Sequence, residues 1–220
     1  MQNINKKKML IIGALSLLMI ALIAIGISLA LMTKRPENRA NNFTFGNVSI
    51  DLSEPEWEEH DSEDKIVYPG RTVSKDPMIT NTGENDLYAY IEVSVPKKTV
   101  RTVKIENDEE VISEARLQEL FSFEPNEGWV LISRDDSGDD YAVYLYAYTA
   151  KTLSPDESTN ALFNSVTYIN MLEGEIPMDT VLEMPINAYA IQSEYLNETG
   201  DTLQAQMTDA FNKYKAEQEK

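Results

Sequence analysis

The stretch KDPMITNTGENDLYAYIEVSVP, from Lys75 to Pro96, gives the clearest indication of the fold. In its second half every other residue is aliphatic and would lie on one face of a strand: Leu87, Ala89, Ile91, Val93 and Val95. The opposite face would carry Tyr88, Tyr90, Glu92 and Ser94. This period of two predicts a half-buried antiparallel strand with its tyrosines exposed. Proline cannot donate to a strand ladder, so we expect the strand to end at Pro96.

The first half of the stretch predicts a turn between two strands. We expect a short strand at Met78–Thr80 and a turn over Asn81–Asp86, where Gly83 would allow a positive φ. Asparagine and aspartate are common in turns because their side chains hydrogen-bond to nearby backbone. We therefore interpret this segment as part of the scaffold and not as a catalytic loop.

The same alternation recurs from Phe43 to about Tyr195. Further strands are predicted at Phe43–Leu52 (with a bulge near Gly46 and Asn47), Thr99–Ile105, Phe121–Phe123, Trp129–Ser133, Tyr141–Thr149, Val166–Ile169 and Val181–Gln192. The loop at 134–140 would close a hairpin. About eight or nine short strands are typical of a sandwich or jelly roll. We expect residues 43–196 to form an all-β, antiparallel, jelly-roll-like β-sandwich.

Two helices are predicted beside the strands. One is a short inserted helix at Glu110–Leu120, and the other is an amphipathic helix within residues 197–220. The second has an apolar stripe at helical spacing, made of Leu203, Met207, Phe211 and Tyr214. Asp201 would cap it, with Gln204 three residues later. The stripe would pack on the chain's own sandwich or dock to a neighbouring subunit.

Residues 1–30 have the pattern of a signal peptide or a membrane anchor. Three lysines, Lys6 to Lys8, precede a long uncharged apolar run from Met9 to Met32. Ser28 and Ala30 supply the small residues of a signal-peptidase site, with cleavage after Ala30. A run of this length would also cross a bilayer as a helix, so residues 9–32 are the part predicted to contact a membrane. Residues 31–42 are polar and contain Pro36, as expected of a flexible arm.

The charge and composition exclude several classes of function. The chain has 220 residues, with 19 lysines and arginines against 37 aspartates and glutamates. Residues 31–220 carry 16 of these basic residues and all the acids, a net charge of −21, so nucleic acid is not an expected partner. The chain has no cysteine, which rules out a disulfide framework, and its one histidine is His60. Export without cysteine is compatible with a bacterial source.

Two segments are candidates for metal binding. Asp135, Asp136, Asp139 and Asp140 flank a glycine in the predicted hairpin loop, and such clustered oxygens suit Ca²⁺. The loop lacks the spacing of an EF-hand, so it also fits an ordinary polar loop. His60 follows the acidic stretch EPEWEE and could ligate zinc, but it has no second histidine to pair with. The alternative for that stretch is a solvated loop with Trp57 packed against the sandwich.

Alternating tyrosines mark one face of the strand at Tyr141–Thr149. Tyr144, Tyr146 and Tyr148 share this face, and Val143, Leu145 and Ala147 share the other. The tyrosines would cover the second layer of the sandwich. Alternatively they form an exposed face that binds glycans or a partner protein, because aromatic patches often mark interfaces.

Four segments resemble the TasA/camelysin family. They are FTFGNVSIDLSEPEW (43–57), YPGRTVSKDPMITNTGENDLYAYIEVSVP (68–96), GWVLI (128–132) and INAYAIQSEYL (186–196). Members of that family are exported from Gram-positive bacteria, cut by a dedicated signal peptidase, and include fibre subunits of the biofilm matrix. The resemblance covers about 150 residues and depends on the order PG, K-DP, NTG, N-D and Y along the chain.

The resemblance implies a jelly roll that assembles when the N-terminal segment of one subunit completes the sheet of the next. Phe43, Phe45, Val48 and Ile50 would be the apolar positions of that segment. We therefore expect an exported, non-enzymatic structural protein, with copies of itself or related matrix subunits as partners and no obligatory cofactor. The arm at 31–42 departs from the pattern, since it has Pro36 and little alternation. The alternatives are a secreted camelysin-like metallopeptidase that uses His60, and a membrane-tethered adhesin.

Overall fold

The computed structural model describes residues 43–45, 48–59, 68–177, 180–194 and 199–218. The chain divides into two compact units, Met1–Arg39 and Ala40–Lys220, and every described residue belongs to the second. The predicted signal peptide or anchor and the arm at 31–42 lie outside the described residues. Among the described residues, no helix is long and apolar enough to span a membrane.

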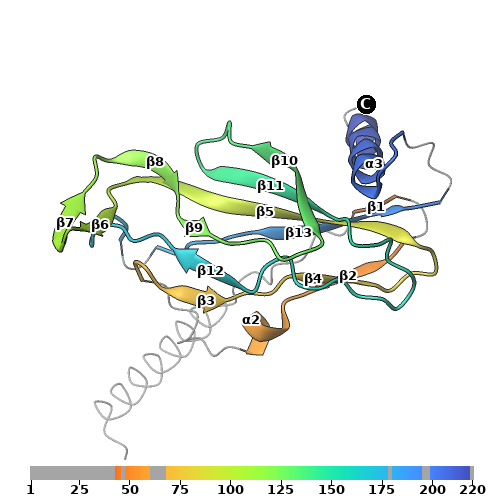
Figure 1. Cartoon of the computed structure of the whole chain (residues 1–220), viewed down its shortest axis with the longest axis horizontal. Coiled ribbons are helices and arrows are strands. Elements are labelled where there is room, and N and C mark those ends of the chain that lie inside the picture. Colours follow the sequence, from red (N-terminus) through yellow and green to blue (C-terminus); the bar gives the residue numbers. More distant parts are fainter. Residues whose placement is uncertain (1–42, 46–47, 60–67, 178–179, 195–198, 219–220) are drawn as a thin grey trace, which may run out of the picture. The chain divides into compact units, whose positions relative to one another are not determined.

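The described residues form two layers of strands with a helix on the outside (Figure 1). The first layer is a six-stranded sheet of β1 (Phe43–Phe45), β13 (Ile186–Gln192), β5 (Leu87–Val100), β11 (Tyr141–Tyr148) and β10 (Trp129–Asp135), in that order, with β8 (Arg116–Glu119) paired to the end of β5. The second layer holds β3 (Thr72–Ser74), β12 (Ser165–Tyr168) and β9 (Phe121–Ser122), together with the pair β2 (Ile50–Ser53) and β4 (Met78–Asn81).

A separate hairpin and two helices complete the fold. The hairpin consists of β6 (Val103–Glu106) and β7 (Glu109–Ile112), and the helices are α2 (Pro55–Glu59) and α3 (Leu203–Gln218). Every strand pair is antiparallel except that of β1 with β13. The predicted class, mostly β and antiparallel with a C-terminal helix, is confirmed.

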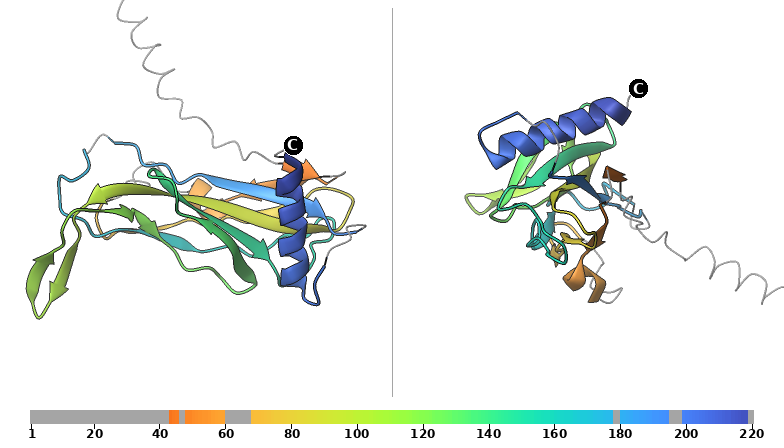
Figure 2. Two further views of the ribbon diagram at one scale, coloured as in Figure 1. Left: turned by 90° about the horizontal axis from the view of Figure 1, so that it is seen from above. Right: turned by 90° about the vertical axis from the view of Figure 1, so that its right-hand side faces the viewer.

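Strand β5 lies at the centre of the six-stranded sheet, and both of its faces are buried. Leu87, Ile91, Val93 and Val95 are fully enclosed between the two strand layers, as the alternation predicts. The prediction that the tyrosines of the other face are exposed is wrong, because α3 crosses that face (Figure 2). Tyr90 is completely buried, and its hydroxyl donates a 2.9 Å hydrogen bond to the backbone oxygen of Met207.

Pro96 does not end β5, which continues to Val100. The proline lies where β5 changes partner: Tyr141 of β11 is opposite Pro96, and β8 pairs with β5 from Lys97 onward. The carbonyl of Pro96 accepts a hydrogen bond from the amide of Leu120. Proline is tolerated at this change of partner strand because no backbone N–H is needed there for pairing.

The C-terminal helix packs on the chain's own sheet, which confirms one of the two predicted alternatives. Its whole stripe faces a second apolar cluster that includes Tyr88, Tyr90, Leu145, Ala147 and Ile191. The predicted cap is wrong by one residue, since the hydroxyl of Thr202 and not the side chain of Asp201 accepts the amide of Ala205, at 3.2 Å. Phe211 packs against Tyr90 and Tyr189, with ring centroids 5.1 and 5.6 Å apart.

The predicted helix at Glu110–Leu120 is wrong, because this segment forms β7 and β8. Asn107 and Asp108 both have positive φ values, and this tight turn reverses the chain into a hairpin. The β-branched pair Val111 and Ile112 favours the extended strand that follows.

Three predicted strands are divided or clearly shorter in the structure. Thr99–Ile105 is divided, because β5 ends at Val100 and β6 begins at Val103. Phe43–Leu52 is not one strand, since β1 lies on the six-stranded sheet and β2 pairs with β4; the predicted bulge at Gly46 and Asn47 lies outside the described residues. In the predicted strand at Val181–Gln192, only Ile186–Gln192 is extended and paired, because Pro185 comes directly before it.

Asn81 organises the turn that follows β4. It is fully buried, and its amide nitrogen donates to the backbone oxygens of Asn85 and Leu153, each at 2.9 Å. Its side-chain oxygen accepts the amide of Gly83 at 2.9 Å. Gly83 does not use the positive φ that glycine allows. This position favours glycine because a Cβ would lie 2.8 Å from the backbone nitrogen of Ser49.

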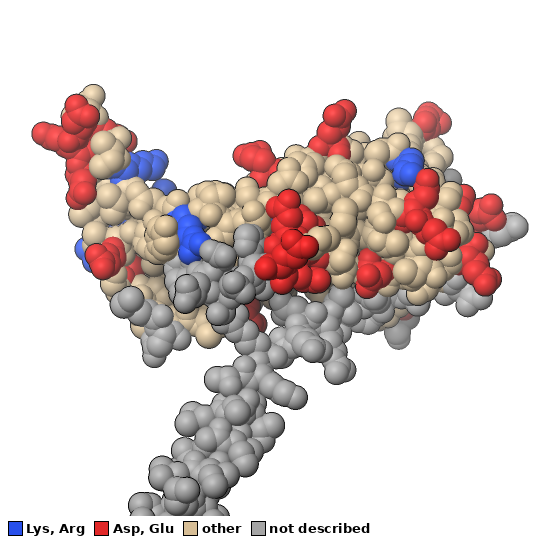
Figure 3. Space-filling model, turned by 90° about the horizontal axis from the view of Figure 1, so that it is seen from below, with Lys and Arg blue, Asp and Glu red and all other residues tan. Residues whose placement is uncertain are grey.

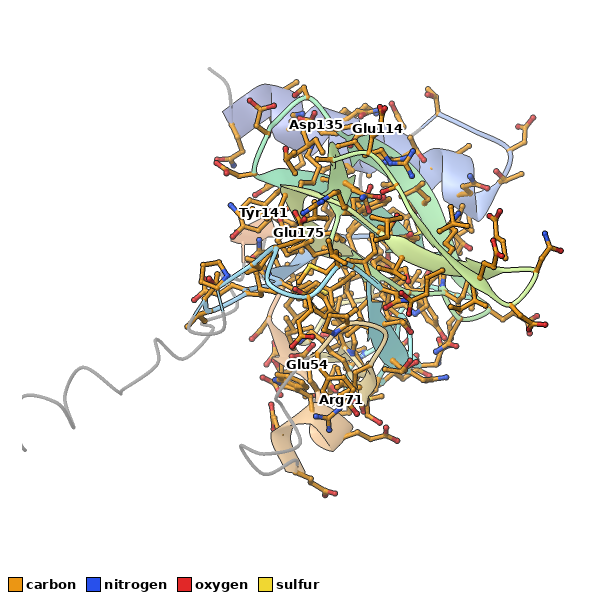
Figure 4. The ribbon with its side chains drawn as sticks, turned by 90° about the vertical axis from the view of Figure 1, so that its left-hand side faces the viewer. Glu54, Arg71, Glu114, Asp135, Tyr141 and Glu175 are labelled. Carbon is orange, nitrogen blue, oxygen red and sulfur yellow. The ribbon has the colours of Figure 1, made fainter. Side chains whose placement is uncertain are left out.

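The K-DP motif fixes α2 against the second layer. The carboxylate of Asp76 accepts the amide of Glu56 at 3.0 Å and so caps the helix. Lys75 is buried; its Nζ lies 2.8 Å from Oε2 of Glu54 and 4.9 Å from the ring centroid of Trp57. The prediction that Trp57 packs against the strands is confirmed. Glu54 lies on the opposite side of the molecule from Asp135 (Figure 4).

Replacing Met207 by alanine tests the cover that α3 gives to β5. We expect the free energy of unfolding to fall by about 2–4 kcal/mol, because the fully buried side chain would leave a cavity over the tyrosines. Urea unfolding followed by circular dichroism measures this change. The exposed Gln204 on the same helix is the control, and Gln204→Ala should leave the free energy of unfolding almost unchanged. Equal losses of stability in the two variants would contradict the packing of α3 on β5.

Gly83→Ala tests the close approach of the turn to Ser49. We expect a loss of about 1–3 kcal/mol, since the backbone must move to admit the new methyl group. Gly138→Ala is the matched control, because its Cβ would meet only ordinary contacts, 3.5 Å from the backbone oxygen of Tyr141. Thermal unfolding of both variants compares them directly. A Gly83 variant as stable as the Gly138 variant would show that the turn has room to adjust.

Candidate functional site

The outer edge of β13 is the first candidate for an interaction site. The three residues of β1 pair with it in parallel, Phe43 with Tyr189, Thr44 with Ala190 and Phe45 with Ile191. On its inner side β13 pairs with β5 over seven residues. The outer edge is therefore only partly covered by a described strand, and the strand that covers it is very short. Backbone groups at such an edge are a template for another strand.

The two outer edges of the six-stranded sheet differ. At the far side, β10 has an irregular register between Leu131 and Ser133 and ends in the charged pair Arg134 and Asp135. Bulges and charges on an edge strand prevent pairing with a further strand. The sequence of β13, INAYAIQ, has no charged residue. The edge at β13 is thus the more receptive of the two.

The residues predicted for assembly occupy two different positions. Phe43 and Phe45 lie in β1 on the six-stranded sheet. Val48 and Ile50 are 5 % and 4 % exposed and belong to the core between the layers. The two pairs are separated because the predicted strand is divided into β1 and β2. Only the short β1 lies at the sheet edge, and Val48 and Ile50 hold the chain to its own core.

A cleft lined by aromatic rings is the second candidate. It has a volume of about 440 Å³ and lies beside β9, β11 and β12, between the strand layers. Its walls include the rings of Phe121, Phe123, Tyr144, Tyr146 and Tyr168. Such a cleft can hold an apolar or aromatic group of a ligand or partner.

The alternating tyrosines of β11 face this cleft and the core. Tyr146 and Tyr148 are buried with the second layer, which confirms that they cover it. Tyr144 is only partly buried and packs at the rim. Tyr146 and Tyr148 thus cover the second layer, whereas the ring of Tyr144 is the accessible one that a ligand or partner could contact.

A polar network holds the rim of the cleft. The hydroxyl of Tyr144 donates to Glu119, at 2.7 Å from each carboxylate oxygen, and Arg134 lies 2.8 Å from the same carboxylate. The guanidinium of Arg134 also lies over the Tyr144 ring, 5.1 Å from its centroid. Burial and the neighbouring Glu119 raise the pKa of Tyr144 well above its usual value, and burial raises the pKa of Tyr146 to about 12. The sequence pattern marked the tyrosines but not Glu119, which β8 brings to β5, or Arg134, which lies opposite Tyr144 on the neighbouring strand β10.

Asp135 and Asp136, two of the four aspartates of the hairpin loop, bind different partners. Asp135 accepts the amide and hydroxyl of Ser137, at 2.9 and 2.7 Å, and these hydrogen bonds lower the pKa of its carboxyl group. Asp136 pairs with Arg134 at 3.1 Å. Among the described residues, no group of three or more histidine, aspartate or glutamate side chains is arranged to hold a metal ion. The hairpin between β10 and β11 is confirmed, and calcium binding by its loop stays a prediction.

The other predicted site residues lie outside the described residues. These are His60, with its suggested zinc, and Ser28 and Ala30 at the predicted cleavage site. Comparison of the chain with protein-family models, curated proteins and solved structures gives no match.

The raised tyrosine pKa values predict a loss of stability at alkaline pH. Burial raises the pKa of Tyr144, Tyr146 and Tyr189 in the folded state, whereas the unfolded chain loses these protons near pH 10. The contribution of these tyrosines to the free energy of unfolding is complete below about pH 10, and it declines as the pH rises through their folded-state pKa values. Urea unfolding across this range, with tyrosinate absorbance, measures both effects. Full ionisation near pH 10 in a protein that stays folded would contradict the burial.

Proposed function

We propose that this chain is an exported structural protein, a subunit of an extracellular matrix fibre or cell-surface coat of a Gram-positive bacterium. Its motifs resemble the TasA/camelysin family, and we further propose that its two strand layers follow a jelly-roll topology. Signal peptidase would release the chain after Ala30, with residues 9–32 as the part that meets the membrane. Its partners are other copies of the chain or related matrix subunits.

The observation that carries this proposal is the pairing of β1 with β13. The pairing uses backbone groups over only three residues, so it contributes little to holding β1 on its own subunit. A neighbour's β1 can pair with the same edge in the same register, because the exchanged strand is identical. Such an exchange is head-to-tail and does not close, so it builds a fibre.

The difference between the two sheet edges supports a single direction of growth. The charges and irregular register of β10 oppose strand addition, whereas the uncharged β13 accepts it. The net charge of the exported part, −21, keeps the subunits soluble and repels them at long range. Short-range backbone pairing would therefore dominate only once two edges meet.

Proline substitution in β1 tests this assembly. Along β1 only every second backbone N–H donates to β13. Proline has no N–H, so the double variant Thr44→Pro, Phe45→Pro removes a donor whichever of the two residues makes the hydrogen bond. We expect protein without residues 1–30 to form fibres by electron microscopy and sedimentation, and the proline variant to stay monomeric with an unchanged circular dichroism spectrum. The core should survive because β1 contributes only three residue pairs.

The control is Thr44→Ala, Phe45→Leu, which changes the same positions and keeps both backbone donors. It should assemble like the original chain. Fibres of equal number and length from the proline variant would remove β1 from the mechanism. An original chain that remains monomeric at all soluble concentrations would overturn the proposed function itself.

A further inference from the structure

The hairpin β6–β7 projects from the strand layers and is not part of either apolar cluster (Figure 1, Figure 2). Its residues are exposed, with Val103 at the base partly buried. Four of the seven exposed large apolar side chains among the described residues lie in or beside it: Ile105, Val111, Ile112 and Leu117. The core does not need these side chains, so their concentration on a projection requires another reason.

The projection is firmly built. At its base, the amide of Val103 donates to the backbone oxygen of Asn170, and the Asn170 side chain donates back to the Val103 oxygen at 2.9 Å. Ser113 closes the base by accepting the amide of Thr102 at 2.8 Å. At the tip, the two positive φ values at Asn107 and Asp108 are those of a tight hairpin turn. A fixed hairpin can present its side chains without a large loss of entropy.

The pairing register places apolar side chains on one face of the hairpin. Val103 is opposite Ile112, and Ile105 is opposite Glu110. Since residues two apart share a face, Val103, Ile105 and Ile112 form an apolar strip that ends at Glu110. Ile105 is 64 % exposed and Ile112 is 48 % exposed.

Charge is divided between the two ends of the projection. The tip carries Glu106, Asp108, Glu109 and Glu110. The root, where the hairpin meets β5 and β8, carries Lys98, Arg101, Lys104 and Arg116, along with Glu114. Figure 3 shows red at the projecting end and blue beside it. Arg101 pairs with Glu175, whereas Lys104 and Arg116 make no ion pair with a described residue.

We propose that the hairpin is a self-association site that pairs with the hairpin of a second copy, side by side and in opposite directions. This arrangement places the acidic tip of each copy against the basic root of the other and covers both apolar strips. A two-fold contact of this kind is closed, because the same surface is used on both copies. It is separate from the edge at β13 and does not depend on strand exchange.

The small size of the hairpin makes the contact weak between free subunits. Interfaces below about 1,200 Å² are generally transient. In a fibre many such contacts would act together, so the same pairing would join fibres sideways. The charges make it sensitive to salt, because exposed charges are screened within about 10 Å at about 0.1 M ionic strength.

Two charge-reversed variants test the pairing. One reverses the tip, Glu109→Lys with Glu110→Lys, and the other reverses the root, Lys104→Glu with Arg116→Glu. Both are made in the Thr44→Pro, Phe45→Pro background without residues 1–30, so that exchange of β1 does not contribute. All four positions are exposed, and circular dichroism checks that the fold is kept. Sedimentation equilibrium measures the mass of each protein alone and of the equimolar mixture.

The parent should dimerise at high concentration and less so in high salt. Each variant alone should be monomeric, because the attraction between tip and root is lost at both ends. The tip with Glu109→Lys and Glu110→Lys has no net charge, and the root with Lys104→Glu and Arg116→Glu repels the acidic tip. The mixture should recover the dimer, since a basic hairpin then meets an acidic one. A parent that stays monomeric at its highest soluble concentration would overturn the proposal, and so would a mixture no heavier than its components. Neither result would affect fibre formation through β1.

Discussion

The burial of β5 on both faces is the constraint on which the rest of the structure depends. One face is closed by the second layer of strands, and the other is closed by α3. Tyr88 and Tyr90 lie on the outer face of β5, and the apolar stripe of α3 packs on them and removes them from water. The C-terminal helix is therefore part of the same compact unit as the sheets.

Local alternation was sufficient to predict most strands and, for β5, the side that faces the second layer. It could not predict that the outer face of β5 is covered, because the covering residues come much later in the sequence, as Met207 does after Tyr90. The prediction for the segment 110–120 was wrong because asparagine and aspartate are common both in turns and just before helices, and only the positive φ values of Asn107 and Asp108 distinguish the hairpin. The role of Gly83 depends on the distant backbone of Ser49, which no local pattern contains.

The candidate sites were predicted only in part. The tyrosines of β11 and the N-terminal strand were marked by their pattern, whereas Glu119 and Arg134 meet Tyr144 through the pairing of β8 with β5 and of β10 with β11. The difference between the edges of β10 and β13 required knowledge of the strand order. Both proposed contacts use surfaces outside the core. One is the partly paired edge of β13, and the other is the hairpin β6–β7, which has exposed apolar side chains, an acidic tip and a basic root.

The core around β5 carries an edge strand, β1, that pairs with it over only three residues. Hydrogen–deuterium exchange of monomeric protein, resolved to single amides, measures both parts at once. The account predicts that amides within Leu87–Val95 exchange only through global unfolding, while those of Phe43–Phe45 exchange with little protection. Equal protection of the two segments would contradict it, because β1 would then be a fixed part of its own subunit.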